Sequence, residues 1–198
     1  PDLIRKLLAM PCFQNLSLRR ATHPAPTGSN FTIDDIVEPV PGSRDRVQLD
    51  LFPYQEVIGI MAYLARGSRP DLTAFVSIMQ SFQANYSLRH IVHLEHAARY
   101  LRGTIDTAMV CAPDGPEFLY AATDATYGTC PKTCKSQTGF CIFLRGILIE
   151  WRSFKQKSLA QSSMESEVIA NNEATKAIMG VRIILEELGF GHYLKQST

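Results

Sequence analysis

The fold is decided by residues 138–153, which read TGFCIFLRGILIEWRS. Two apolar and aromatic runs, at 138–145 and 147–153, flank the dipeptide Arg145-Gly146. A short run rich in β-branched and aromatic residues favours a strand, and a dipeptide containing glycine favours a tight turn. We therefore predict a β-hairpin here.

The segments on either side complete the pattern. Residues 107–112 and 117–123 have strand character and flank the turn-forming sequence Pro113–Pro116. A long helix is predicted from Ser162 to about Leu188, because apolar residues recur there at helical spacing. Strands followed by one covering helix indicate an α+β fold with a mostly antiparallel sheet.

The region before the strands predicts a small helical bundle. Apolar residues repeat at steps of three and four in three successive segments, which is the stripe of an amphipathic helix. The stripes are Tyr54, Val57, Met61 and Leu64; Leu72, Phe75, Met79 and Phe82; and Ile91, Leu94, Ala98 and Leu101. A short helix at 3–10 and a proline-rich and glycine-rich linker at 22–50 precede them, and Ser87 is suited to cap the third helix.

Composition excludes several classes of protein. Hydrophobic residues make up 45% and charged residues 20% of the 198 residues, which is typical of a globular chain rather than a disordered one. The five cysteines are odd in number and scattered, so we expect a reducing, intracellular location in the cytoplasm or nucleus rather than secretion. No apolar run is long enough to predict a membrane span.

Several phrases of the sequence point to a known family. They are Tyr54–Leu64, Arg69–Leu72, His93–Thr104, Thr123–Gly128, Lys135–Phe140, Ser162–Ala170 and Leu185–Gly189. In this order they resemble the copia-type retrotransposon polyprotein, over roughly residues 50–190 and weakly over the first 30. Thr126 and Tyr127 depart from the pattern, because Asp and Trp usually stand there.

The resemblance implies a division of the chain. Residues 1–50 would be the end of a reverse transcriptase thumb and a linker, and 51–104 a helical connection region. Residues 105–198 would be a ribonuclease H-like domain that is incomplete at its C-terminal end. Ile33–Val37 holds paired aspartates but lacks the apolar hairpin of a polymerase centre, so we predict a surface loop or the start of a short helix there and expect the polymerase aspartates upstream of Pro1.

The resemblance also implies a carboxylate site. Ribonuclease H chemistry uses Mg²⁺ or Mn²⁺ held by acidic side chains, and we assign Asp124 and Glu167 as catalytic metal ligands that reach one ion. The alternatives are a turn aspartate and a solvated helical glutamate. Glu165 has the spacing of a capping box with Ser162, which gives it a structural role. Two further ligands are expected beyond Thr198, so we expect little or no activity from these residues alone.

Basic residues between 130 and 160 predict contact with an RNA–DNA hybrid or another nucleic acid. They are Lys132, Lys135, Arg145, Arg152, Lys155 and Lys157, with Trp151 and Phe154 among them. Cations contact phosphates and aromatic rings stack on bases. A solvated sheet face is the alternative, and the sequence does not separate the two.

Other candidate sites and functions are weaker. His90, His93 and His96 are interpreted as structural or surface histidines, and Cys130 and Cys134 as free thiols in a loop. The first functional hypothesis is a polyprotein fragment that works with upstream polymerase domains. The second is a decayed or domesticated, non-catalytic module that binds nucleic acid or another partner, and the third is an unrelated α+β protein.

Overall fold

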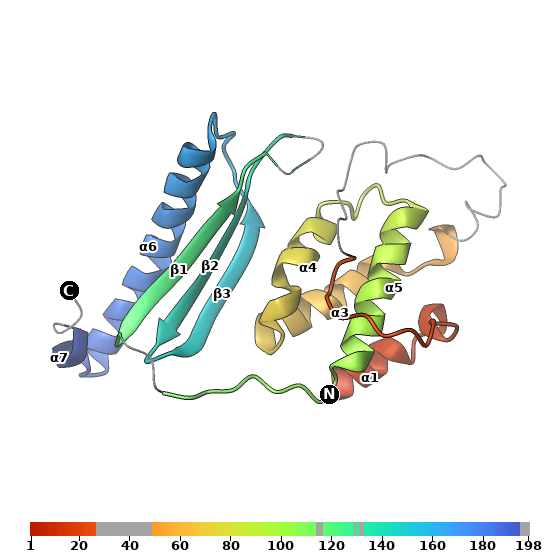
Figure 1. Ribbon diagram of the computed structural model, residues 1–198, viewed down its shortest axis with the longest axis horizontal. Helices are drawn as coiled ribbons and strands as arrows, with labels where there is room; N and C mark the ends of the chain where they lie inside the picture. Colours follow the sequence, from red (N-terminus) through yellow and green to blue (C-terminus); the bar gives the residue numbers. More distant parts are fainter. Residues whose placement is uncertain (27–48, 114–116, 129, 131–132, 195–198) are drawn as a thin grey trace. The chain divides into compact units, whose positions relative to one another are not determined.

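The chain forms two compact units, residues 1–108 and 109–198, in a computed structural model (Figure 1). The structure describes the chain apart from residues 27–48, 114–116, 129, 131–132 and 195–198. Unit 1 contains α1 (Asp2–Leu8), the 3-10 helix η1 (Pro11–Phe13), α3 (Tyr54–Gly67), the 3-10 helix η3 (Pro70–Leu72), α4 (Thr73–Gln80) and α5 (Leu88–Gly103). Unit 2 contains β1 (Leu119–Thr126), β2 (Gln137–Leu144), β3 (Ile147–Lys155), α6 (Ser163–Glu187) and α7 (Gly191–Leu194).

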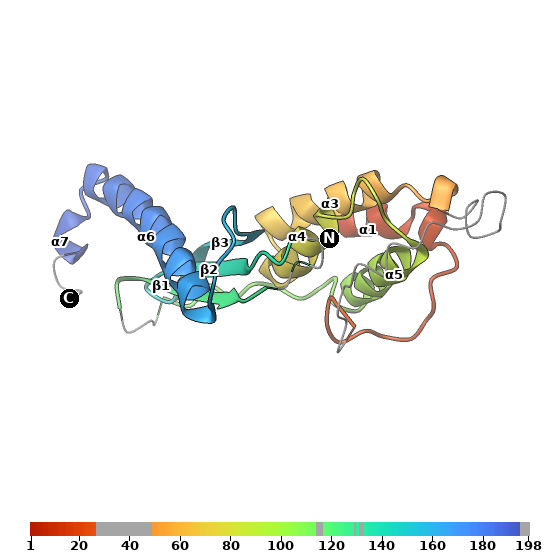
Figure 2. The same cartoon turned by 90° about the horizontal axis from the view of Figure 1, so that it is seen from above.

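Unit 1 is a helical bundle around one apolar core. The three predicted amphipathic helices are confirmed as α3, α4 and α5, and their stripes are buried. The first helix is also confirmed, and α1 lies beside α3 and α5 (Figures 1 and 2). Ser87 caps α5 as predicted, in a reciprocal arrangement in which its backbone N–H donates to Nδ1 of buried His90 at 3.0 Å.

A polar network joins two of the sequence phrases in unit 1. Arg69, nearly buried, donates to Asp71 at 2.7 Å and to the Thr104 hydroxyl at 2.7 Å. Tyr100 donates to the same Asp71 carboxylate at 2.6 Å. Burial alone would raise the pKa of Asp71, but the hydrogen bonds from Arg69 and Tyr100 outweigh it and hold that pKa below its ordinary value. The network ties the turn before α4 to the end of α5.

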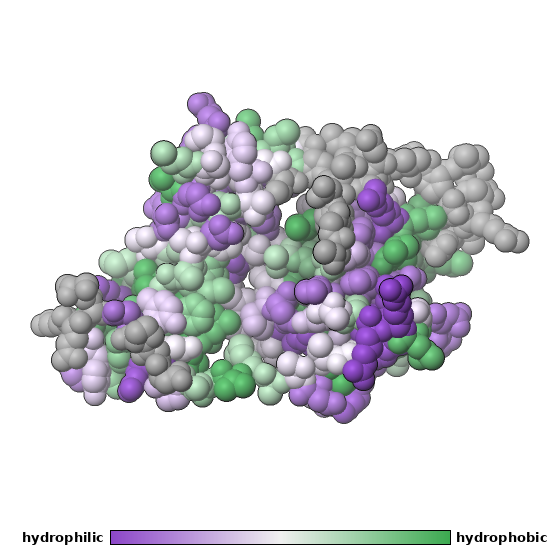
Figure 3. All heavy atoms as spheres, viewed as in Figure 1, coloured by the Kyte–Doolittle hydropathy of each residue, from purple (hydrophilic) through white to green (hydrophobic). Residues whose placement is uncertain are grey.

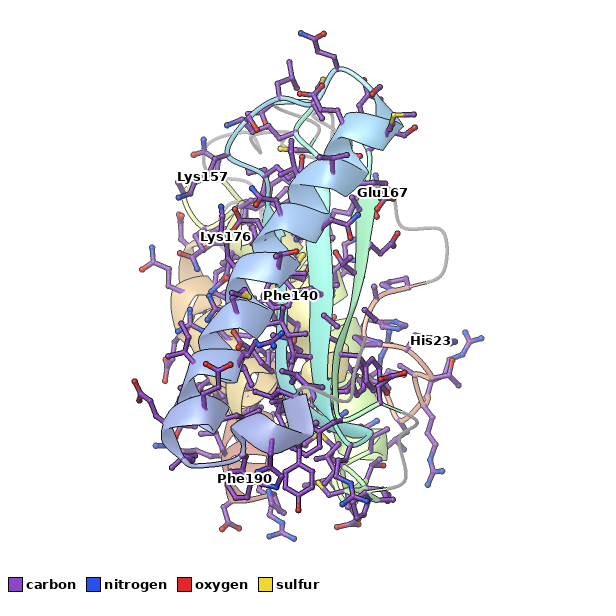
Figure 4. All side chains as sticks on the ribbon, turned by 90° about the vertical axis from the view of Figure 1, so that its left-hand side faces the viewer. His23, Phe140, Lys157, Glu167, Lys176 and Phe190 are labelled. Carbon is purple, nitrogen blue, oxygen red and sulfur yellow. The ribbon has the colours of Figure 1, made fainter. Side chains whose placement is uncertain are left out.

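Unit 2 is a three-stranded antiparallel sheet in the order β1-β2-β3, with α6 across one face (Figures 2 and 4). The predicted hairpin is confirmed, since Arg145 and Gly146 have φ of 51° and 84° and connect β2 to β3. Phe140 and Ile142 of β2 pack with Ala174 of α6 to form the core. A β-bulge lies opposite Ile142 and Phe143. The α+β class is thereby confirmed.

One predicted strand is wrong. Residues 107–112 form no strand, and their side chains are exposed, with Val110 at 83%. The apolar composition of this segment suggested a strand, but a strand is stable only when a neighbour pairs with it. Ile33–Val37 and most of the predicted turn at Pro113–Pro116 lie outside the described residues, as does the larger part of the predicted linker.

Candidate carboxylate site

Asp124 stands near the end of β1, on the side of the sheet away from α6. Leu119 and Ala121 of the same strand pack against the core that α6 covers. Side chains alternate along a strand, so Asp124, three residues after Ala121, projects from the opposite face. Its side chain is exposed, and its backbone partner on β2 is Gly139. Gly139 has no side chain, so the sheet surface next to Asp124 is open.

The first turn of α6 is organised by a cap. The Ser162 hydroxyl accepts from the Glu165 N–H at 3.1 Å, as the capping-box spacing predicts. The Glu165 carboxylate, however, accepts from the Gln161 N–H at 2.7 Å rather than from the cap residue. Glu165 therefore has the expected structural role through a partner one residue earlier.

Glu167 lies on the flank of α6 that faces β1. Ser166 and Ala170 are buried against the sheet, and Glu167 next to them is half-buried. Figure 4 shows Glu167 near the N-terminal end of α6, beside the β1 edge of the sheet. Asp124 and Glu167 thus come from two packed elements, at the end of unit 2 where β1 ends and α6 begins (Figure 1).

Hydrogen bonds from two side chains, which the sequence did not predict, position this end of α6. The buried side chain of Gln156 donates to the Thr138 hydroxyl at 3.0 Å and to the Ser166 carbonyl at 2.9 Å. The Tyr127 hydroxyl, just after β1, donates to the Gln161 carbonyl at 3.2 Å. These bonds hold the start of α6 to the sheet, so they position Glu167. Gln156 stands between Lys155 and Lys157, so no signal in the sequence around it marked its burial.

The two carboxylates, Asp124 and Glu167, are suitable ligands for a hard divalent cation, but they are only two. Carboxylate oxygens are the ligands that Mg²⁺ and Mn²⁺ prefer. Neither Asp124 nor Glu167 takes part in an ion pair within the described residues. In that same part of the chain, no three His, Cys, Asp or Glu side chains gather as a metal site. The pair could supply two ligands of a larger set.

The structure separates the predicted basic residues. Strand alternation places Arg152 and Phe154 on the α6 face of β3, where Arg152 pairs with Glu150 at 2.9 Å. Phe154 contacts Phe140 edge to face, with ring centres 6.4 Å apart, so its ring belongs to the core and is not presented for base stacking. Lys155 projects from the same face as Asp124.

Two of the other predicted cations, Lys135 and Lys157, lie close to Lys155 in sequence or structure. Lys135 donates through its ammonium to the Lys157 carbonyl. Lys132 falls outside the described residues. Strand alternation thus places Lys155, but not Arg152, on the Asp124 face, whereas Lys135 and Lys157 lie just outside the strands and contact each other.

A groove separates β3 from α6. Its volume is about 580 Å³, and Phe140, Phe154, Ala177 and Val181 contribute its apolar lining. Two ion pairs border it, Glu150–Arg152 and Glu173–Lys176. Each charge at the groove is thus already neutralised by a neighbour.

The histidines of α5 and the two cysteines lie where they were expected from the sequence, in the core, at the surface or in a loop. His90 and His93 are buried in unit 1, and His96 contacts the His23 carbonyl at 3.1 Å. Cys130 and Cys134 lie between β1 and β2 and take part in no disulfide bond. The described helices include none that is long and apolar enough to cross a membrane.

Known proteins provide an independent comparison. No protein-family model matches the chain, and no solved structure matches it either. The chain is 32% identical over 137 residues to the retrovirus-related Pol polyprotein from transposon TNT 1-94 of Nicotiana tabacum, covering 69% of the chain and 10% of that relative. It is 28% identical over 136 residues to the retrovirus-related Pol polyprotein from transposon RE1 of Arabidopsis thaliana, covering 69% of the chain and 9% of the relative.

A shorter relative is matched over most of its length. The chain is 32% identical over 124 residues to the secreted RxLR effector protein 161 of Plasmopara viticola, covering 63% of the chain and 87% of that protein. In the two Pol polyproteins, by contrast, the chain spans about a tenth of the length.

Proposed function

Because the chain belongs to the family that includes the retrotransposon Pol polyproteins, we infer that it is a segment of a copia-type polyprotein whose unit 2 is a ribonuclease H-like module. The proposed activity is divalent-metal-dependent hydrolysis of the RNA strand in an RNA–DNA hybrid. The proposed partners are that hybrid and the polymerase domains of the same polyprotein, inside the cell.

One observation carries the proposal. Asp124 and Glu167, two carboxylates that form no ion pair with any described residue, arise from β1 and α6, which pack against each other. Asp124 projects from the far face of β1 and Glu167 from the flank of α6 beside β1, so a shared ion would lie at the β1 edge. In the described sheet that edge has no neighbouring strand, which leaves room for ligands from elsewhere.

The residues where β1 ends and α6 begins each have a role in the proposed chemistry. Asp124 and Glu167 would hold Mg²⁺ or Mn²⁺, and the chemistry supplied by such ions is activation of water and stabilisation of the leaving oxygen. Gln156 and Tyr127 position the start of α6. Lys155 would contact phosphate on the Asp124 face. Two carboxylates do not complete a two-metal site, so we expect hybrid binding with little cleavage by the 198-residue chain.

Metal binding can be tested without relying on activity. Mn²⁺ added to the isotope-labelled chain should broaden the amide NMR signals of residues near Asp124 and Glu167, because the ion is paramagnetic. Asp124→Asn and Glu167→Gln should each weaken the effect strongly, whereas Glu187→Gln, an exposed charge at the other end of α6, should not. The same line broadening in Asp124→Asn, in Glu167→Gln and in the parent chain would contradict the proposal.

Because only two carboxylate ligands are described, a second function is also supported. A non-catalytic module that binds nucleic acid needs the lysines but no metal. It predicts that hybrid binding persists in a chelator, is unchanged by Asp124→Asn and falls in Lys155→Met. Metal-dependent binding that Asp124→Asn abolishes would instead favour the ribonuclease H-like function.

A further inference from the structure

Two cysteines between β1 and β2 are joined through their backbone groups. The Cys134 N–H donates to the Cys130 carbonyl at 2.8 Å, and the Cys130 N–H donates to the Lys135 carbonyl at 3.0 Å. Cys134 has a φ of 51°, in the left-handed region that suits the end of a turn. A bond from residue i+4 to residue i closes an α-turn, and a rise of about 1.5 Å per residue puts the Cα atoms of its two end residues roughly 6 Å apart. Disulfides span about 4.4–6.8 Å between Cα atoms.

The two thiols differ in their surroundings. The ammonium of Lys155 lies 3.5 Å from the Cys130 sulfur. A cation at this distance favours the thiolate, which is the nucleophilic form. Cys134 is exposed, so its thiol is accessible to a modified Cys130. The pair therefore combines an activated sulfur with an accessible second sulfur.

The other cysteines of unit 2 lack this combination. Cys141 is half-buried on β2, and burial raises the pKa of its thiol. Cys111 is exposed, and the described residues provide no hydrogen bond to its thiol. These two residues serve as internal references for reactivity.

We propose that Cys130 and Cys134 form a reversible dithiol–disulfide site that reacts with peroxides. The Cys130 thiolate attacks the peroxide, so an S–O bond forms, the O–O bond breaks and hydroxide leaves. The Cys134 sulfur then attacks the Cys130 sulfur, so the S–S bond forms, the S–O bond breaks and water leaves. The two sulfurs lose two electrons, which the peroxide accepts, and a small thiol reverses the step.

Oxidation changes the surface next to the candidate carboxylate site. The disulfide removes the thiolate that faces Lys155, and the ammonium then faces solvent. The chemistry of the thiol pair does not depend on the proposed ribonuclease H-like function. An experiment can therefore reject the thiol-pair proposal without rejecting the ribonuclease H-like function, and the reverse.

Peptide mapping tests the disulfide directly. Trypsin cleaves after Lys132, between the two cysteines, and releases Thr133–Lys135 unless a disulfide retains it. The chain should carry Cys111→Ser, because Cys111 and Cys130 share one tryptic peptide. After dilute hydrogen peroxide, the monomer should yield Thr133–Lys135 linked to the peptide that ends at Lys132. A free tripeptide, or a link to Cys141 or Cys12, would overturn the proposal.

The role of Lys155 has its own test. Lys155→Met should slow alkylation of Cys130 by iodoacetamide at neutral pH by about three- to tenfold, because the cation that favours the thiolate is gone. Lys157→Met is the matched control and should leave the rate unchanged. In Cys134→Ser, dimedone should trap the sulfenic acid at Cys130 after peroxide treatment. Equal alkylation rates in both lysine variants, or no trapped adduct, would contradict the assignment of Cys130 as the first sulfur.

Discussion

The two units use apolar residues in opposite ways. Unit 1 gathers those of α1, α3, α4 and α5 into one large buried cluster, whereas the buried cluster of unit 2 consists of Phe140, Ile142 and Ala174. Unit 2 instead exposes apolar side chains on α6, including Met164 at 76% and Val168 at 61%. On the face drawn in Figure 3, green hydrophobic patches interrupt unit 2, and purple hydrophilic side chains are prominent on unit 1.

The larger apolar core and the candidate chemical groups lie in different units. Burial of apolar area is the main source of folding free energy, so unit 1 has the larger reserve. The candidate carboxylates and the reactive thiol pair all belong to unit 2. The chemically interesting unit is therefore the one with the smaller core, and perturbing each unit in turn tests this contrast.

The largest effect is expected from a core truncation in unit 1. Leu94→Ala should lower the free energy of unfolding by about 2–5 kcal/mol, because Leu94 is fully buried in a cluster that cannot collapse around the gap. Ile142→Ala, equally buried in unit 2, should cost less, because the thin core there can relax. Amide hydrogen exchange followed peptide by peptide would measure both losses, and a larger loss for Ile142→Ala would reverse the contrast.

Removing the carboxylate of the unit 1 network should have the next largest effect. Asp71→Asn should cost about 1.5–3 kcal/mol, because the charge-assisted hydrogen bonds that the carboxylate accepts from Arg69 and Tyr100 are weakened. The pKa of Asp71 is lower in the folded state, so its stabilisation is present above its unfolded pKa of about 3.9 and is lost as pH falls through the folded value.

The same variant has a distinct pH signature. Urea unfolding of Asp71→Asn should be less sensitive to pH than that of the parent chain in the acid range below about pH 4. Tyr100→Phe, which keeps the carboxylate and its bond to Arg69, should retain most of the acid sensitivity. An identical pH dependence in Asp71→Asn and the parent would show that Asp71 does not contribute to it.

A smaller effect is expected at the hairpin of unit 2. Gly146→Ala should cost about 1–2 kcal/mol, since φ is 84° there and a Cβ is strained in the left-handed region. Gly139→Ala is the matched control, because its Cβ would meet open space and its φ is not positive. Fluorescence of Trp151, the single tryptophan, reports unfolding of unit 2 selectively. Equal losses at the two glycines would contradict the turn argument.

The smallest effect concerns the start of α6. Ser162→Ala should lower stability by about 1 kcal/mol, since the Glu165 N–H loses its acceptor. Ser163→Ala, one residue later, should change little. Trp151 fluorescence during urea unfolding would compare the two, and an equal shift would argue against the cap.

Local patterns predicted the elements whose stability is decided locally. The stripe from Tyr54 to Leu64 and the turn at Arg145-Gly146 were confirmed, because helical spacing and a left-handed glycine specify those structures by themselves. The strand at 107–112 was wrong, because its existence depends on a partner that sequence spacing does not reveal. Tertiary pairing, not local propensity, decides such segments.

The candidate site was only partly predictable for the same reason. Asp124 and Glu167 were assigned from a family resemblance, and their roles as ligands stay predictions. Gln156 was missed, because its burial is stable only with Thr138 and Ser166 as partners, which lie far from it in the sequence. The division of Arg152 and Lys155 between opposite faces required the strand register.

The β-bulge in the hairpin of unit 2 decides where β3 tolerates the insertion or deletion of a residue. Phe143 pairs with Leu148 and Ile142 with Glu150, so Ile149 has no partner on β2. Deleting Ile149 would leave Glu150–Lys155 on the same faces, whereas deleting a residue after Glu150 would turn every later side chain over. Insertions and deletions of single residues should therefore survive in diverging copies at Ile149 and be eliminated farther along the strand.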